Sequence, residues 1–235
     1  MVCAQETKHR TLSHGYWFTP RVAYELHDSS SVFLEGNTRF HGVQNQERKG
    51  IAQYLYRSYL ELGYEHCFSD QIQLGASGKF IQLANDQEWF YKAYFQHLGR
   101  FLKHDFNTRI FVEYIREVAD DNASTVEADI GRWSVELELR KRFESGLGYA
   151  LQFRPFQYFN IENQNYTSFK DRFFDRSRTT VELLYWPKEQ WYFSFFYMKE
   201  TEYYYVSAQS PEHKLNQHRF IFGARLIYRI IHDYN

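Results

Sequence analysis

Long apolar runs, cysteines and an excess of charge of one sign are all lacking in this chain of 235 residues. No apolar run reaches the roughly 18 residues that a transmembrane helix requires, so helical membrane spans are excluded. The 2 cysteines, Cys3 and Cys67, are too few for a disulfide framework. A net charge of −1 argues against a nucleic-acid-binding surface, and no glycine-rich phosphate-binding loop is present.

Aromatic residues are abundant instead, at 20% of the chain, with 20 tyrosines and 22 phenylalanines. The mean hydropathy of −0.64 is that of a water-soluble protein. Strands that alternate apolar and polar residues give the same average, because each apolar face is balanced by a polar one. The order of the residues therefore decides the class of protein.

The clearest alternation lies in the last long stretch, residues 217–231. After His218 its even positions are all apolar or aromatic, whereas its odd positions carry three arginines and a glycine. A period of two residues is typical of a β-strand with two unlike faces. The charged face consists of Arg219, Arg225 and Arg229.

The same alternation predicts about ten long strands, arranged as a single all-β, up-and-down antiparallel transmembrane β-barrel. The expected strands are residues 17–26, 51–66, 72–80, 89–102, 106–118, 130–143, 147–154, 178–186, 191–206 and 217–231. An extra strand at 32–40 stays open. An even number of strands would place both ends of the barrel chain in the periplasm.

Short and long connections alternate along the chain, as in outer-membrane barrels with short periplasmic turns and longer external loops. The predicted turns are residues 67–70, 103–105, 144–146 and 187–190. The predicted loops are residues 28–50, 119–129, 160–176 and 207–216.

Volume indicates which face meets lipid. Several large apolar side chains from each of about ten strands would overfill the interior of a small barrel. We therefore expect the apolar face to contact outer-membrane lipid and the charged face to line the lumen. A soluble lipid-carrier barrel, with its apolar face inside, is the alternative.

Both signs of charge alternate on the lumen face, so we expect paired networks that plug the lumen. The predicted lumen charge network is Arg21, Glu25, Arg57, Glu61, Arg109, Glu113, Arg132, Glu136, Glu138, Arg140, Glu182, Arg219, Arg225 and Arg229. Because closure places the first strand beside the last, Glu25 is the expected partner of the arginines in 217–231. Aromatic belts mark both membrane interfaces, and the predicted girdle is Trp17, Trp89, Trp133, Trp186 and Trp191.

No pattern requires an enzyme. The candidates for catalysis lie in predicted loops or at strand ends and lack the spacing of a triad: His97, His213, His218, Ser207, Ser210, Asp120 and Asp121. Glu136 and Glu138 lie about 7 Å apart on one strand face, which suits glycosidic acid–base work. The flanking Arg132 and Arg140 favour a salt-bridge ladder instead. No cofactor is expected.

Metal binding has no support either, since His41, His66 and His104 lack the spacing of metal ligands. Residues 1–14 are interpreted as a residual leader, because residues 2–4 resemble the end of a signal peptide, and residues 15–235 as the barrel. A plain disordered N-terminus is the alternative. The run Tyr203, Tyr204 and Tyr205 predicts either anchoring in lipid headgroups or a docking surface for another outer-membrane protein.

Residues 59–64, the hairpin 135–153 and residues 218–228 together resemble small outer-membrane barrels of the Bacteroidetes type, which include a family of unknown function with the same rhythm. The resemblance extends over most of the chain from about residue 15. It implies a barrel in the bacterial outer membrane and no catalytic residues. Residues 232–235 depart from the C-terminal aromatic of many such barrels, so the assembly signal is displaced or altered.

The sequence as a whole favours a non-enzymatic outer-membrane barrel that serves as an accessory or structural subunit of a larger envelope assembly. A small channel or transporter is the first alternative. A hydrolase that acts at the barrel rim is the second.

Overall fold

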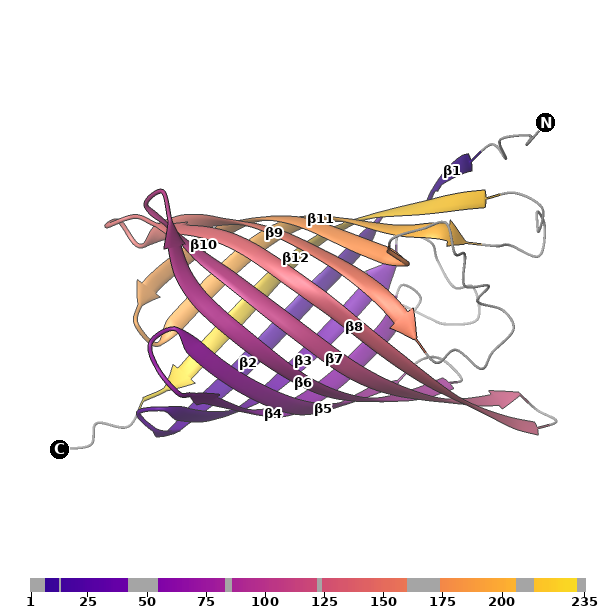
Figure 1. Cartoon of the computed structure of the whole chain (residues 1–235), viewed down its shortest axis with the longest axis horizontal. Helices are drawn as coiled ribbons and strands as arrows, with labels where there is room; N and C mark the ends of the chain where they lie inside the picture. Colours follow the sequence, from indigo (N-terminus) through magenta and orange to yellow (C-terminus); the bar gives the residue numbers. More distant parts are fainter. Residues whose placement is uncertain are drawn as a thin grey trace.

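The computed structural model describes residues 7–12, 14–41, 55–82, 86–121, 124–159, 174–205 and 214–231. Within these ranges all regular structure is β-strand, which confirms the expected all-β class. Eleven strands, β2 to β12, close into one barrel, and their ribbons wind obliquely around it (Figure 1). No helix in the described part of the chain is long and apolar enough to cross a membrane.

Each strand from β2 to β12 pairs with the next one along the chain, antiparallel and without a crossover. This order confirms the up-and-down arrangement. The strands are β1 (Thr7–Thr11), β2 (Gly15–His27), β3 (Ser30–His41), β4 (Leu55–Cys67), β5 (Ile72–Gln82), β6 (Asp86–Phe101), β7 (His104–Asp121), β8 (Ser124–Arg142), β9 (Leu147–Phe159), β10 (Arg176–Lys188), β11 (Trp191–Tyr205) and β12 (Lys214–Ile230).

The two faces of the barrel wall differ as the alternation predicts, with the apolar face outside. Leu62 and Leu183 are 63% and 67% exposed, whereas their neighbours Glu61 and Glu182 are 4% and 1% exposed. Successive side chains of a strand point to opposite faces of the sheet. The barrel is therefore apolar on its outer surface and polar in its lumen, the reverse of a soluble lipid carrier.

The barrel closes between β2 and β12, which run parallel, with Gly15 opposite Ile221 and Tyr24 opposite Ile230. The even count expected from the sequence is wrong, because residues 30–41 form strand β3 where the loop 28–50 was expected. With an odd number of alternating strands, the first and last must point the same way. Figure 1 accordingly shows β2 and β12 running in one direction, with the two ends of the chain at opposite ends of the barrel.

Two further segments depart from the sequence prediction. Residues 119–121 and 124–129 belong to β7 and β8, which pair up to Asp121 and Ser124, rather than to a loop. Strand β1, within the predicted leader, pairs parallel with β12 beyond the point where β2 begins. Both extend the sheet at the same end of the barrel.

The two ends of the barrel differ in their connections. At the end where β12 finishes, called the turn end, the connections are short: residues 28–29, 68–71, 102–103, 143–146 and 189–190. At the opposite end, called the loop end, they fall in residues 42–54, 83–85, 122–123, 160–173 and 206–213, outside the described ranges.

Aromatic rings lie flat against the inner wall where a glycine faces them on the next strand. Phe196 of β11 is directly opposite Gly223 of β12, and Tyr94 of β6 is directly opposite Gly75 of β5. A Cβ atom on Gly223 would lie 2.1 Å from Cζ of Phe196. These glycines keep large rings out of the middle of the lumen.

We expect Gly223→Ala to lower the free energy of unfolding by about 1–3 kcal/mol, because the ring of Phe196 must leave its place. Gly78→Ala is the matched control, since an added Cβ there meets nothing within 4 Å, and a change within about 0.5 kcal/mol is expected. Urea unfolding in lipid vesicles measures both. Equal effects of the two substitutions would contradict the packing role of Gly223.

Candidate functional site

The lumen contains a cavity of about 1080 Å³. At the turn end its lining includes Asp28, Asp70 and Asp105. Toward the loop end the lining extends to the level of Trp17 and Tyr59. The cavity therefore opens at the turn end and passes through most of the barrel.

An apolar layer closes the lumen beyond that level. This layer consists of Ile81, Phe90, Ile115 and Ile130, each at most 6% exposed, with the rings of Tyr59 and Tyr158 packed against it. A second cluster completes it: Phe196, Met198 and Ile221, with Trp17. The two clusters draw side chains from β2, β4–β9, β11 and β12. Within the described residues the cavity is blind at this end.

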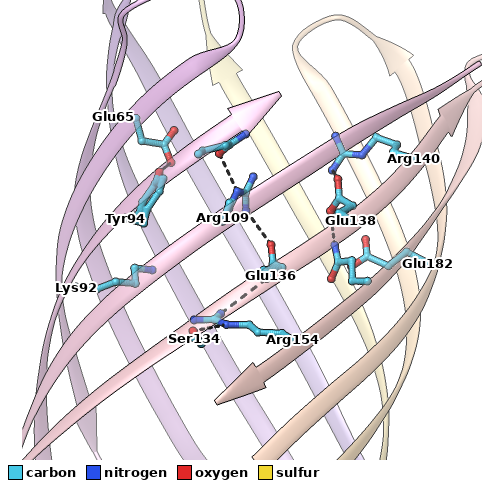
Figure 2. A network of polar contacts seen from close by, with 12 residues as sticks. Glu65, Lys92, Tyr94, Arg109, Ser134, Glu136, Glu138, Arg140, Arg154 and Glu182 are labelled. Carbon is cyan, nitrogen blue, oxygen red and sulfur yellow. Dashed lines mark hydrogen bonds and ion pairs between the residues drawn. The ribbon is translucent and has the colours of Figure 1, made fainter. Parts of the chain in front are cut away.

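A central network of five charges crosses the cavity wall from β7 to β9. Arg109 Nη1 lies 3.4 Å from Glu136, and Arg154 bridges Glu136 at 3.8 Å and Glu113 at 3.6 Å. Arg132 Nε donates to Glu113 at 2.7 Å. Figure 2 shows Arg109 and Arg154 converging on Glu136. Arg132 and Glu113 are buried, and burial of such charges is tolerated only when they are paired.

Further ion pairs surround the central network. Most of them join strands that are not direct neighbours, so long side chains reach over an intervening strand. The pairs are Arg21–Glu65 at 2.7 Å, Lys92–Glu61 at 2.6 Å, Arg140–Glu138 at 2.8 Å and Arg225–Glu182 at 3.4 Å. Nearer the loop end lie Arg57–Glu88, Arg178–Glu200 at 2.6 Å, Arg219–Glu200 at 3.9 Å and Arg176–Glu202 at 3.3 Å.

The predicted lumen residues Arg219 and Arg225 do face the interior, but their carboxylate partners come from β11 and β10. The expected contact of Glu25 with the arginines of β12 is not formed among the described residues. Because β2 and β12 run parallel and Tyr24 is opposite Ile230, Glu25 lies past the end of β12 at the turn end. Glu25 lines the mouth of the cavity instead, and Arg229 is exposed beside it.

Three of the five tryptophans predicted for the girdle lie on the outer wall. Trp89 and Trp133 are 43% and 38% exposed. The ring of Trp191 packs against Tyr228 at a centroid distance of 4.5 Å. Trp89 near the loop end and Trp191 at the turn end occupy opposite ends of the barrel.

Trp17 and Trp186 line the cavity instead, and their assignment to the girdle is wrong. The reason is the period of two: Trp17 has the same parity as Arg21, and Trp186 the same parity as Glu182, so each shares the inner face of its strand. The sequence contained this signal, but the aromatic character of the two residues outweighed it.

Four inward-facing charges were missed: Glu35, Arg39, Glu88 and Glu200. Glu35 and Arg39 lie in β3, where residues 35, 37 and 39 are polar at every second position. That alternation was available in the sequence but lay within a predicted loop. Glu200 lies in a nearly continuous aromatic stretch whose facing the sequence left ambiguous.

The candidates for catalysis do not assemble in the lumen. His218 lies on the outer wall near the loop end, where its Nδ1 is 3.1 Å from Thr201 Oγ1 and its Nε2 is 3.1 Å from His9 Nδ1. His97 is exposed at the turn end. Outside the described ranges lie Ser207, Ser210 and His213, together with the side chains of His41, Asp120 and Asp121.

The remaining candidates have structural contacts. Glu136 and Glu138 are engaged by arginines, which matches a salt-bridge ladder. His66 Nδ1 is 2.8 Å from Ser30 Oγ, and His104 Nε2 is 2.6 Å from Tyr149 Oη. The described residues contain no group of three or more possible metal ligands.

Tyr203 is half-buried, with its hydroxyl 3.0 Å from Ser177 Oγ. The side chains of Tyr204 and Tyr205 lie outside what the structure describes. Tyr203 therefore packs back onto the barrel.

We expect Glu113→Gln to lower the free energy of unfolding by about 3 kcal/mol, because Arg132 then remains charged and buried without its partner. Glu25→Gln is the control at the cavity mouth, where a change within about 0.5 kcal/mol is expected. Urea unfolding in lipid vesicles measures both. A Glu113 variant as stable as the Glu25 variant would contradict a structural role of the central network.

The comparisons with known proteins bear on the fold. No protein-family model matches the chain, and no curated protein matches it significantly. Among solved structures, the chain is similar to that described as "NanC porin structure in rhombohedral crystal form", with a TM-score of 0.50 and 11% sequence identity. The match covers 92% of this chain and 97% of the porin chain. At this identity the likeness shows a shared barrel fold, so the chain has a porin-like β-barrel architecture.

Proposed function

We propose that this protein is a non-enzymatic β-barrel of the bacterial outer membrane, whose closed lumen suits an accessory or structural subunit of a larger envelope assembly. The single observation that carries the proposal is the apolar layer across the lumen, combined with an apolar outer wall. The first feature opposes transport, and the second calls for lipid.

The outer wall supports the membrane location. Leucine, phenylalanine, tyrosine and valine side chains on most strands are more than a third exposed. Soluble proteins rarely expose contiguous apolar surface beyond a few hundred square ångströms. In a bilayer the same side chains contact acyl chains, and every wall strand has hydrogen-bonded neighbours on both sides. The porin-like fold agrees with this location.

The lumen supports a closed barrel. A conducting pore needs a continuous aqueous path, whereas Ile81, Phe90, Ile115 and Ile130 are buried against one another. On the turn side of this layer the charges are largely engaged with each other, which leaves few free groups to shed and rebind ions. A protein of this kind contributes its outer wall and its ends, where other outer-membrane proteins can bind.

A small channel is the second candidate, favoured by one observation. The cavity of about 1080 Å³ is as large as a typical ligand site and opens at the turn end. Rearrangement of the apolar layer would connect it to the loop end.

We expect the protein to fractionate with outer membranes, to require detergent for extraction, and to migrate faster on gels before boiling than after. Its apolar outer wall is the physical reason. Membrane fractionation and gel mobility measure these properties. Recovery from the aqueous fraction without detergent would favour a soluble carrier and overturn the proposal.

In planar bilayers we expect no steady ion-selective current from the protein, because the apolar layer interrupts the water path. The double variant Phe90→Ala, Ile130→Ala removes bulk from that layer and should produce measurable openings. Leu62→Ala, on the outer wall, is the control and should stay silent. Steady current from the unaltered protein would establish the channel instead.

A further inference from the structure

Two cations lie at the blind end of the cavity without a carboxylate partner. Arg39 of β3 and Lys79 of β5 both line the cavity, and among the described residues neither forms an ion pair. Their contacts are aromatic: the guanidinium of Arg39 lies 3.9 Å from the centre of the Trp17 ring. The ammonium of Lys79 lies 4.3 Å from the centre of the Phe90 ring and 4.9 Å from that of Tyr59.

The neighbouring carboxylates are occupied by other donors. Glu35 accepts the hydroxyl of Tyr59 at 2.9 Å. Glu61 accepts Lys92 at 2.6 Å and Ser77 at 2.7 Å. The positive charge of Lys79, directly opposite Glu61 in the strand register, is therefore left without a direct contact.

The register adds a second cation beside Arg39. Arg39 is directly opposite Arg57 on β4, and like charges in this position are destabilising. Arg57 is neutralised by Glu88 on the loop side. The only hydrogen bond printed for the Arg39 side chain is the one from its Nε to Asn37 Oδ1, at 2.9 Å. The blind end therefore carries an excess of positive charge.

We propose that the blind end of the cavity binds a small solute bearing a phosphate or carboxylate group, with the oxyanion held between Arg39 and Lys79. A guanidinium presents two parallel N–H donors that match the geometry of either anion. The ring of Trp17 fixes its plane, so little side-chain entropy is lost on binding. The rest of the solute occupies the cavity on the turn side, through which it enters.

Binding is tested on the refolded full-length barrel in detergent at low ionic strength, where screening of charge is weakest. Glycerol 3-phosphate, glycerate and glycerol are matched probes that share a three-carbon body and carry a phosphate, a carboxylate and no charge. Titration calorimetry is expected to detect one or both anions and not glycerol. Binding of all three alike, or of none at millimolar concentration, overturns the proposal.

Variants locate the site. Arg39→Met and Lys79→Met are each expected to weaken binding of the anions roughly tenfold or more, because each removes a charge-assisted hydrogen bond. Arg100→Met is the matched control: Arg100 lines the cavity mouth, its side chain is 89% exposed, and a change below about twofold is expected. Each variant must show the gel mobility shift of a folded barrel, and Arg39→Lys provides a variant that keeps the charge.

Affinity unaffected by Arg39→Met in a folded barrel overturns the proposal, and so does an equal loss with Arg100→Met, which indicates a diffuse charge effect. The binding site does not require a closed lumen. A barrel that conducts steadily and still binds glycerol 3-phosphate through Arg39 would overturn only the closed-lumen function. A silent barrel that binds neither anion would overturn only the binding site.

Discussion

The pairing of buried charges inside the barrel is the constraint on which the rest of the structure depends. A strand buries every second side chain, so a wall with an apolar outer face must place its polar residues in the lumen. Isolated buried charges are costly, and arginines must therefore find carboxylates on other strands. Arg154, which bridges Glu113 and Glu136, shows how one side chain fixes the relative positions of three strands. Register, closure and the shape of the cavity all follow from such contacts.

The same constraint explains why the exceptions are informative. Most lumen charges have a partner within a few ångströms, yet Arg39 and Lys79 rest on aromatic rings. Cation–π contact compensates part of the desolvation cost but leaves the net charge in place. Their position next to the apolar layer, at the closed end of a deep cavity, concentrates that charge where solvent screens it least.

The odd number of strands has its own consequence for the wall. A parallel seam between β2 and β12 joins the two ends of the sheet, and parallel pairing is slightly less stable per residue than antiparallel pairing. Pro20 lies in this seam and has no N–H to donate. Side chains compensate across it: Trp17 of β2 packs against Phe196, which lies over Gly223 of β12.

The sequence by itself determined the class of fold, the inner and outer faces and most of the charges in the lumen, because a period of two residues is a local property of the chain. It also contained the inward parity of Trp17 and Trp186, which their aromatic character obscured. Tertiary structure decided which charges meet, since Arg225 reaches Glu182 over an intervening strand and Glu25 lies past the end of β12. It also decided the strand number through β3, whose short turn at residues 28–29 lies in a serine-rich segment typical of a loop. Pairing partners and closure depend on the register of strands far apart in the chain, and no local pattern encodes that.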